Sequence, residues 1–340
     1  KLDLMHFPHF NAPIFCPVKF VVTIHDMTPK YFPGNKVGKS FFRRKMFDLV
    51  MSRALRKSEK IIAVSNFTKN EILKFYPRIK KEKIEVIYEG LREEFFNHIF
   101  SAGQEYTFEE HPQENLLGVL QYNREALQNK FSEDERAKPL ESGASVSEKV
   151  YSCLAHTFIF YTGVWRNHKN LVGLIKAFKI LKDKYKIPHK LVLGGSEDPS
   201  YPEVRRAWEE LDLEKDIILT GFLDLKDQIL LYQNCDLYVS PSFSEGFGFT
   251  PIEAMSQGAV VALSDIPAHR EIAGNLPVYF NPKDSEDMAE KIYLALSDKD
   301  LRNRFLEQGA EFARKYQWQN CANNTLTMVY KHDIQQVKIL

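Results

Sequence analysis

The chain lacks the features that mark a nucleic-acid-binding, membrane-spanning or disulfide-stabilised protein. Its 340 residues carry 46 Lys and Arg against 45 Asp and Glu, so the formal charge of +1 gives no argument for a nucleic-acid partner. No apolar run approaches the roughly 20 residues that a membrane-spanning helix needs. The cysteines show no paired spacing, which predicts neither a zinc site nor a disulfide framework; they are Cys16, Cys153, Cys235 and Cys321.

These absences favour a reducing cytoplasm as the compartment. No signal peptide precedes the first strand, and the chain begins at Lys1 without a methionine. A D-x-D string at Asp298–Asp300 has the form of a metal motif. It follows Ser297 and precedes a helical stretch, so we interpret its acids as the first turn of a helix and predict no metal site.

Length and pattern predict an α/β protein of two domains. A chain of 340 residues exceeds what one core usually holds, and its 44% hydrophobic and 27% charged residues are typical of a soluble globular enzyme. Apolar runs alternate with helical stretches, as in parallel sheets. The first group of runs spans residues 2–7, 19–25, 60–65 and 83–88. The second group spans residues 158–164, 190–195, 217–222, 236–242, 259–264 and 277–281.

Residues 98–150 interrupt this alternation. They are polar, acid-rich and weakly periodic, apart from one amphipathic helix predicted over 116–131. Such polarity favours a mobile inter-domain insertion. A lid or a partner-binding element is the alternative.

The segment 236–258 is the most informative, because an apolar strand leads through a Gly-rich loop directly into a helix. Glu245 and Glu253 stand on either side of that junction, with seven residues between them. In open α/β sheets ligands bind at the carboxyl ends of strands, and a helix N-terminus offers free N–H groups to a phosphate. Thr250, Pro251 and Glu253 match a T-x-x-E capping box. The alternative role of Glu253 is therefore to cap the helix, which needs no ligand. For Glu245 the alternative is an ordinary solvated carboxylate.

This segment resembles the E-x7-E signature of the family 4, or group 1, retaining glycosyltransferases, which use nucleotide sugars and include mannosyltransferases. Other segments follow the family's order: 20–33, 61–72, 158–178, 190–195, 217–242 and 258–274. The resemblance implies the GT-B fold, in which two Rossmann-like domains face each other across a cleft.

The resemblance also implies a division of the chain. The expected parts are an acceptor-side domain over 1–97, a linker over 98–150, a nucleotide-sugar domain over 151–317, and a last helix over 318–340 that crosses back onto the first domain. The family's first strand and Gly-rich turn have no counterpart here. We therefore expect an incomplete N-terminal domain, with Lys1 beginning in mid-domain.

The resemblance assigns catalytic roles to three residues, His25, Glu245 and Lys169. Lys169 matches a family lysine that faces the departing phosphate. The family's arginine position falls on Val164, and Arg166 is the expected substitute. The alternatives are solvated loop cations for Lys169 and Arg166, and a structural histidine for His25.

For the donor, the resemblance places Glu253 at the ribose hydroxyls and Glu245 at the transferred sugar. The backbone around the Gly-rich loop is expected near sugar and phosphate: Gly246, Phe247, Gly248, Phe249 and Thr250. Phe222 matches the position beside the base, with a plain core aromatic as the alternative.

The function implied is retaining transfer of mannose or glucose, from GDP-mannose or UDP-glucose, to a glycan or lipid-linked acceptor, without a metal or other cofactor. A phosphorylase of the same fold and a non-catalytic sugar-nucleotide-binding partner subunit remain alternatives. Residues 36–60 mix basic and apolar side chains, which allows peripheral contact with the inner face of a membrane. A helix packed on the sheet with a solvated basic face is the favoured interpretation of that stretch.

Overall fold

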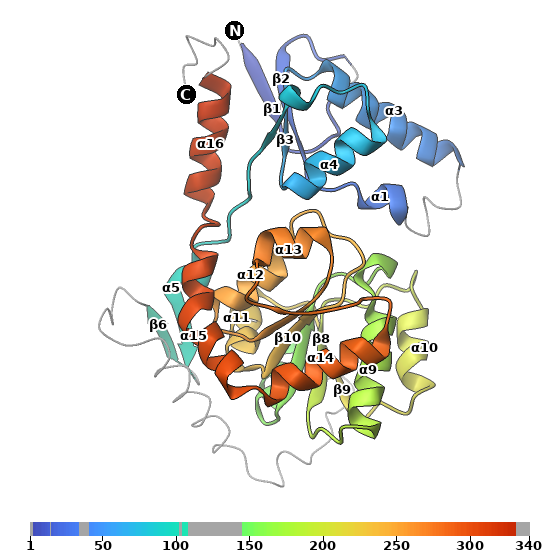
Figure 1. Cartoon of the computed structure of the whole chain (residues 1–340), viewed down its shortest axis with the longest axis vertical. Coiled ribbons are helices and arrows are strands. Elements are labelled where there is room, and N and C mark those ends of the chain that lie inside the picture. Colours follow the sequence, from blue (N-terminus) through green and yellow to red (C-terminus); the bar gives the residue numbers. More distant parts are fainter. Residues whose placement is uncertain (1–2, 14, 34–40, 102–103, 108–144, 331–340) are drawn as a thin grey trace.

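The computed structural model describes residues 3–13, 15–33, 41–101, 104–107 and 145–330. Two α/β domains lie one above the other along the long axis of the molecule (Figure 1). The first is built on four parallel strands in sequence order: β1 (Leu4–Phe7), β2 (Lys19–Ile24), β3 (Lys60–Ala63) and β4 (Ile84–Val86). All four predicted strands of this half are therefore present.

Helices cover both faces of this first sheet. The helices of the first domain are α1 (Thr28–Tyr31), α3 (Phe41–Lys57) and α4 (Asn66–Phe75). Met51 and Ile72 from α3 and α4 join Val22 in one core cluster. The other face meets α16 (Trp318–Tyr330), whose Met328 contacts Val21. This helix of the C-terminal end runs beside the strands of the first domain (Figure 1).

The second domain is built on six parallel strands in the order β12-β11-β10-β7-β8-β9. These are β7 (Phe158–Thr162), β8 (Lys190–Gly194), β9 (Ile217–Gly221), β10 (Leu237–Ser240), β11 (Val261–Ser264) and β12 (Val278–Phe280). Strands β8 and β9 extend the sheet on one side of β7, and β10 to β12 extend it on the other. The order therefore reverses between β7 and β10, which is where open α/β sheets bind their ligands.

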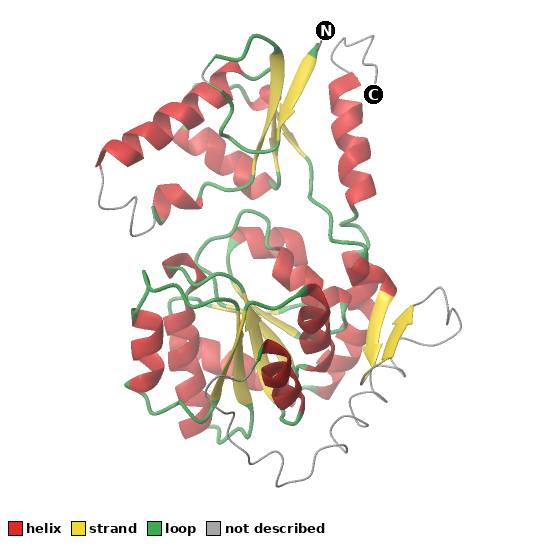
Figure 2. Ribbon diagram, turned by 180° about the vertical axis from the view of Figure 1, so that it is seen from behind, coloured by secondary structure: helices red, strands yellow, loops and turns green. Residues whose placement is uncertain are grey.

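Helices surround this second sheet on both faces (Figure 2). They are α8 (Val146–Leu154), α9 (Leu171–Asp183), α10 (Glu203–Glu209), α11 (Leu225–Asn234), α12 (Phe249–Ser256), α13 (Pro267–Ala273), α14 (Ser285–Ser297) and α15 (Lys299–Ala313). Asp298 is the N-cap of α15, and its Oδ1 accepts a hydrogen bond of 2.9 Å from the Leu301 N–H. The interpretation of the D-x-D string as a helix start is confirmed.

The chain enters the core of the second domain at Leu91, whose side chain and that of Phe95 on α5 (Glu94–Asn97) are buried there. An antiparallel hairpin follows, β5 (His98–Ser101) with β6 (Gln104–Thr107). The helix predicted over 116–131 lies outside the described residues. Across the described ranges no helix has both the length and the apolarity to cross a bilayer.

Candidate active site

The loops that leave β7 and β10 meet at the point where the strand order reverses. Lys169, at the end of the short 3-10 helix Asn167–Lys169, extends toward Glu245 in the loop after β10. Its Nζ lies 2.8 Å from Oε1 and 3.0 Å from Oε2 of that carboxylate. Burial opposes the charged form of Glu245, but the Lys169 ammonium outweighs it and holds the pKa of the carboxyl below its usual value. The pair is therefore charged.

A buried asparagine fixes the lysine loop against the loop that follows β10. Asn170 adopts the left-handed conformation, with φ of 55°. Its Nδ2 donates hydrogen bonds to the carbonyls of Pro241 at 3.1 Å and Pro282 at 2.7 Å. The Phe243 N–H donates to the His168 carbonyl at 2.7 Å. Lys169 and Glu245 are thus held by backbone contacts on both sides.

At Gly246 the backbones of the two domains lie in close contact. A Cβ atom placed on Gly246 would lie 1.9 Å from the carbonyl oxygen of His25, at the end of β2. The Gly246 carbonyl accepts a hydrogen bond of 2.7 Å from the hydroxyl of Ser65, which is the N-cap of α4. Only glycine fits this contact, because any side chain would strike backbone.

His25 lies at the carboxyl end of β2, as the sequence predicts, and both of its ring nitrogens are engaged. Nδ1 is 3.0 Å from Oε1 of Glu89, and Nε2 is 2.7 Å from the Pro8 carbonyl. Both partners are acceptors, so the arrangement favours the doubly protonated ring. The hydrogen bond that His25 donates to Glu89 is the main reason why the pKa of His25 is raised. Asp26 does not orient the ring; it caps the next turn by accepting from the Thr28 N–H at 2.8 Å.

The predicted start of the helix after the Gly-rich loop is wrong by two residues. The N-cap of α12 is Gly248, with φ of 94°, and the helix begins at Phe249. Thr250 therefore lies inside the first turn, and no capping box forms. A glycine in the left-handed region lets the chain turn into the helix before the T-x-x-E pattern is reached.

Glu253 therefore does not cap the helix. Its Oε2 accepts hydrogen bonds from Nε2 of Gln228 at 2.9 Å and from the hydroxyl of Tyr232 at 3.0 Å, both on α11. Burial raises the pKa of Glu253 to about 7, and the bond from Tyr232 and the charge of Arg92 offset only part of this effect. Among the described residues none donates to Oε1, so one oxygen remains available to a ligand.

The two predicted aromatic contacts have very different surroundings. Phe247 is 4% exposed, and its ring packs edge-on against Tyr316 with centroids 5.5 Å apart. Its side chain belongs to the core, so only its backbone can meet a ligand. Phe222 follows β9 and is 76% exposed. It is not a core aromatic, which removes the structural alternative for this residue.

A cavity of about 1210 Å³ opens between the two domains. Its walls include four predicted site residues, Arg166, Lys169, Glu245 and Gly246. The first domain contributes residues from α1, from its C-cap and from α3, among them Tyr31, Phe32, Arg43, Arg44 and Phe47. Neither Glu253 nor Phe222 lines this cavity. His25 is likewise absent from its lining, so of the predicted site residues the structure brings only Arg166, Lys169, Glu245 and Gly246 to this cavity.

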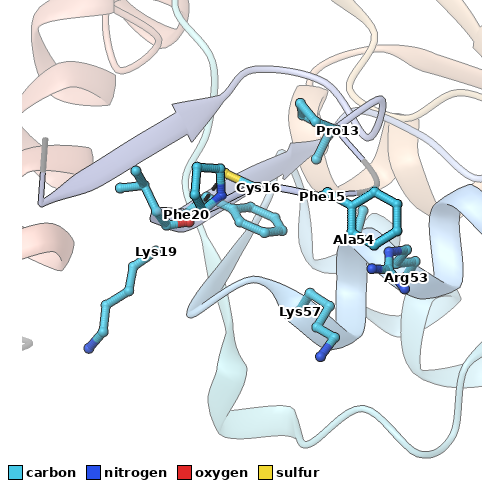
Figure 3. A pocket seen from close by; sticks show the side chains of 11 residues that line it. Pro13, Phe15, Cys16, Lys19, Phe20, Arg53, Ala54 and Lys57 are labelled. Atoms are coloured by element: carbon cyan, nitrogen blue, oxygen red, sulfur yellow. Dashed lines mark hydrogen bonds between the residues drawn. The ribbon is translucent and has the colours of Figure 1, made fainter.

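A second pocket, of about 700 Å³, lies on the first domain alone, between the β1–β2 connection and α3. Phe15 lies beside Arg53 at its rim, with the guanidinium carbon 5.4 Å from the ring centroid (Figure 3). No predicted site residue lines this pocket. It is therefore separate from the cleft.

Sequence reasoning missed Glu89 and His269. Glu89 follows β4 at the same sheet edge as His25, so the strand-end rule that selected His25 would also have found it. His269 is 1% exposed and lies beneath Gly248, where a Cβ would be 3.6 Å from its ring. It lies within α13 rather than at a strand end, so no sequence pattern pointed to it.

Known proteins share both the motifs and the architecture. Residues 154–312 match the family model of the glycosyl transferases group 1, and residues 1–95 match that of Glycosyltransferase Family 4. The serotype-specific mannosyltransferase WbdA of Escherichia coli is 28% identical over 313 residues, 90% of this chain and 33% of that protein. O-antigen chain mannosyltransferase B of Escherichia coli is 24% identical over 331 residues, 95% of this chain and 73% of that protein.

Among solved structures, sucrose-phosphate synthase from Thermosynechococcus elongatus superposes with a TM-score of 0.68 at 18% identity, covering 97% of this chain and 73% of that one. Anabaena HepE in complex with UDP and glucose superposes with a TM-score of 0.65 at 17% identity, covering 92% of this chain and 72% of that one. The fold and the cleft are those of the GT-B glycosyltransferases. Within that class, the chain belongs to the group 1, family 4 glycosyltransferases. It spans about one third of the length of WbdA.

Proposed function

We propose that the protein transfers a hexose, with mannose favoured over glucose, from a nucleoside diphosphate sugar to a glycan or lipid-linked acceptor, with retention of configuration. The observation that carries this proposal is the Lys169–Glu245 ion pair, which faces the inter-domain cavity at the reversal of the strand order. A fixed cation at this position can stabilise the charge of a departing phosphate.

Each part of the donor has a residue suited to it. Lys169 and Arg166, on one loop, suit the diphosphate, together with the first N–H groups of α12. Glu245 suits the hydroxyls of the transferred sugar, and Oε1 of Glu253 suits those of the ribose. Phe222, exposed at the end of β9, offers a face for the base. We assign charge stabilisation to the two cations rather than to a metal ion.

The acceptor must lose a proton when the sugar is transferred to it. Moving the sugar forms a bond from the acceptor oxygen to the anomeric carbon and breaks the bond from that carbon to the diphosphate. Both ring nitrogens of His25 already bond to acceptors, and Glu245 is paired with Lys169, so neither side chain is placed to take the acceptor's proton. The departing phosphate oxygen therefore takes the proton on the same face, which leaves the configuration retained and requires no nucleophile from the protein.

The choice of sugar and acceptor draws on the relatives. WbdA and the O-antigen proteins are described as mannosyltransferases, which favours GDP-mannose. HepE is described in complex with UDP-glucose, which keeps UDP-glucose as the second donor. A Campylobacter jejuni relative, 30% identical over 44% of this chain, acts on a diphospho-undecaprenol-linked sugar, which favours a lipid-linked acceptor.

Product analysis with each donor tests this proposal. Incubation with GDP-mannose or UDP-glucose and a glycan acceptor should give an α-linked product, seen by mass spectrometry and by the anomeric NMR signal. A sugar phosphate formed only when inorganic phosphate is added would instead show a phosphorylase. Donor binding without any consumption, across lipid-linked and glycan acceptors, would show a partner subunit.

The pKa of Glu253 predicts how donor binding depends on pH. The carboxyl must lose its proton to accept two ribose hydrogen bonds, so affinity should rise as the pH passes through about 7. The intact sugar nucleotide has no group of its own that titrates there. Titration calorimetry from pH 6 to pH 8 should show the rise, and Glu253→Gln should abolish it while weakening binding at pH 8. An identical pH dependence in the variant would return Glu253 to a structural role.

We also propose that the first domain touches an anionic membrane surface through the start of α3. Phe41 and Phe42 are each 71% exposed there, beside Arg43 and Lys45. Exposed aromatics among cations suit the interfacial region of anionic lipid.

Flotation with vesicles that contain phosphatidylglycerol tests this contact. The protein should float with the vesicles, and Phe41→Ser with Phe42→Ser should reduce the bound fraction several-fold. The matched control is Leu326→Ser, which removes an exposed apolar side chain from α16. Equal flotation of all three proteins would exclude α3 as the contact.

A further inference from the structure

Helix α4 of the first domain is capped by a carboxylate that belongs to the second domain. Glu271, on α13, accepts hydrogen bonds from the backbone N–H of Asn66 at 2.6 Å and of Phe67 at 2.8 Å. These are the first two residues of α4, whose N–H groups have no partner inside the helix. Figure 1 shows α13 at the edge of the second domain that faces α4. The contact joins the two domains through a helix end.

The same carboxylate also holds the segment that connects the domains. Its Oε1 accepts a bond of 3.0 Å from the hydroxyl of Tyr88, which lies between β4 and α5. The Nδ2 of Asn66 adds a further bond of 3.0 Å. Glu271 therefore accepts four hydrogen bonds, all from residues on the first-domain side of the cleft. The negative charge of Glu271 also interacts favourably with the positive end of the α4 dipole.

The N-terminus of α4 is also where the Gly-rich loop rests. The hydroxyls of Ser65 and Thr68 donate to the Gly246 carbonyl at 2.7 Å and 3.3 Å. Gly246 follows Glu245 directly. The Thr68 hydroxyl also lies 3.4 Å from the His25 carbonyl oxygen. Glu271 and the Gly-rich loop thus both bind the first turn of α4, and this turn contacts the backbone of His25.

We propose that Glu271 is a positioning residue, which locks the first domain onto the Gly-rich loop so that His25 faces the donor sugar. The assignment rests on the proposed transferase function. Donor binding uses residues of the second domain, so it should not need Glu271. Transfer needs the two domains in one fixed relative position, because a misplacement of about 1 Å in a reacting group can lower a rate roughly 10²-fold.

Two variants and one control test this role. Glu271→Ala removes every acceptor, and Glu271→Gln keeps the size and one acceptor oxygen. Glu290→Ala removes an exposed glutamate from α14 of the same domain and is the matched control. We expect about a 10²-fold fall in kcat for Glu271→Ala and a smaller fall for Glu271→Gln, with donor Kd within twofold of the parent in both. Small-angle X-ray scattering should show a larger radius of gyration for Glu271→Ala and no change for Glu290→Ala.

The radius of gyration and the donor affinity can be measured even if no acceptor is turned over. Failure of the Glu271 proposal can therefore be told apart from failure of the proposed transferase function. An unchanged radius of gyration in Glu271→Ala would overturn it. So would a loss of donor affinity without domain opening, since Glu271 would then act inside the donor site. Should Glu271→Ala fail to fold, Glu271→Gln supplies the same measurements. Its radius of gyration must then be larger than that of the parent protein.

Discussion

Replacing Lys169 by methionine is expected to lower kcat/KM by about 10²–10³-fold, the size of effect seen when one fixed transition-state donor is removed. The Lys169 ammonium contacts both oxygens of Glu245, at 2.8 Å and 3.0 Å. Without it the site loses the cation that we assign to the departing phosphate, and Glu245 loses its ion-pair partner. Methionine keeps the length of the side chain, so the loss reports the charge rather than the volume.

Steady-state kinetics with the active donor measure this effect. Lys176→Met serves as the control, because Lys176 is an exposed lysine on the neighbouring helix α9. The two variants remove the same charge from the same part of the chain. A Lys169→Met enzyme that works as well as Lys176→Met would exclude Lys169 from the reaction.

Loss of the His25 imidazolium is the second large effect. His25→Gln keeps a hydrogen-bond donor but no charge, and we expect about a 10²-fold fall in kcat, at the lower end of the loss seen when one fixed transition-state donor is removed. The pKa of His25 is raised above 6.5 by the hydrogen bond with Glu89. The charged form is therefore present at low pH and is lost as the pH rises through the raised pKa.

The pH profile of kcat checks this account of His25. Activity should fall on the alkaline side with an apparent pKa above 6.5, and Glu89→Gln should move that fall to lower pH. The pair also stabilises the fold fully below pH 6.5, and that contribution disappears as the pH rises through the raised pKa. Glu85→Gln, on the exposed side of β4, should change neither profile. An alkaline limb that Glu89→Gln leaves in place would contradict the assignment.

Local patterns were enough to predict the strands and the edge of the sheet where the site lies. Parallel strands are covered on both faces, so each is a short apolar run, and the residue that follows it lies at the carboxyl edge. The structure has His25 at the end of β2 and Lys169 and Glu245 in the loops after β7 and β10, the positions that the family resemblance implied. Local patterns also predicted the helix start at Asp298.

The pattern failed where tertiary contacts decide the local structure. Thr250 and Glu253 have the spacing of a capping box, but Gly248 begins the helix earlier. The partners of Glu253 are Gln228 and Tyr232, which lie 25 and 21 residues earlier in the chain and meet it only when α11 packs on α12. The cap from Glu271 depends on how two domains sit together, which no periodicity within one domain reveals.

We infer that loops of the second domain bind the diphosphate of a sugar nucleotide beside Lys169. A crystal structure of the chain grown with GDP-mannose is the most direct measurement. The account predicts a diphosphate oxygen about 3 Å from Nζ of Lys169 and the hexose against Glu245. A nucleotide bound instead in the first-domain pocket of Figure 3, or no bound nucleotide at saturating concentration, would contradict it.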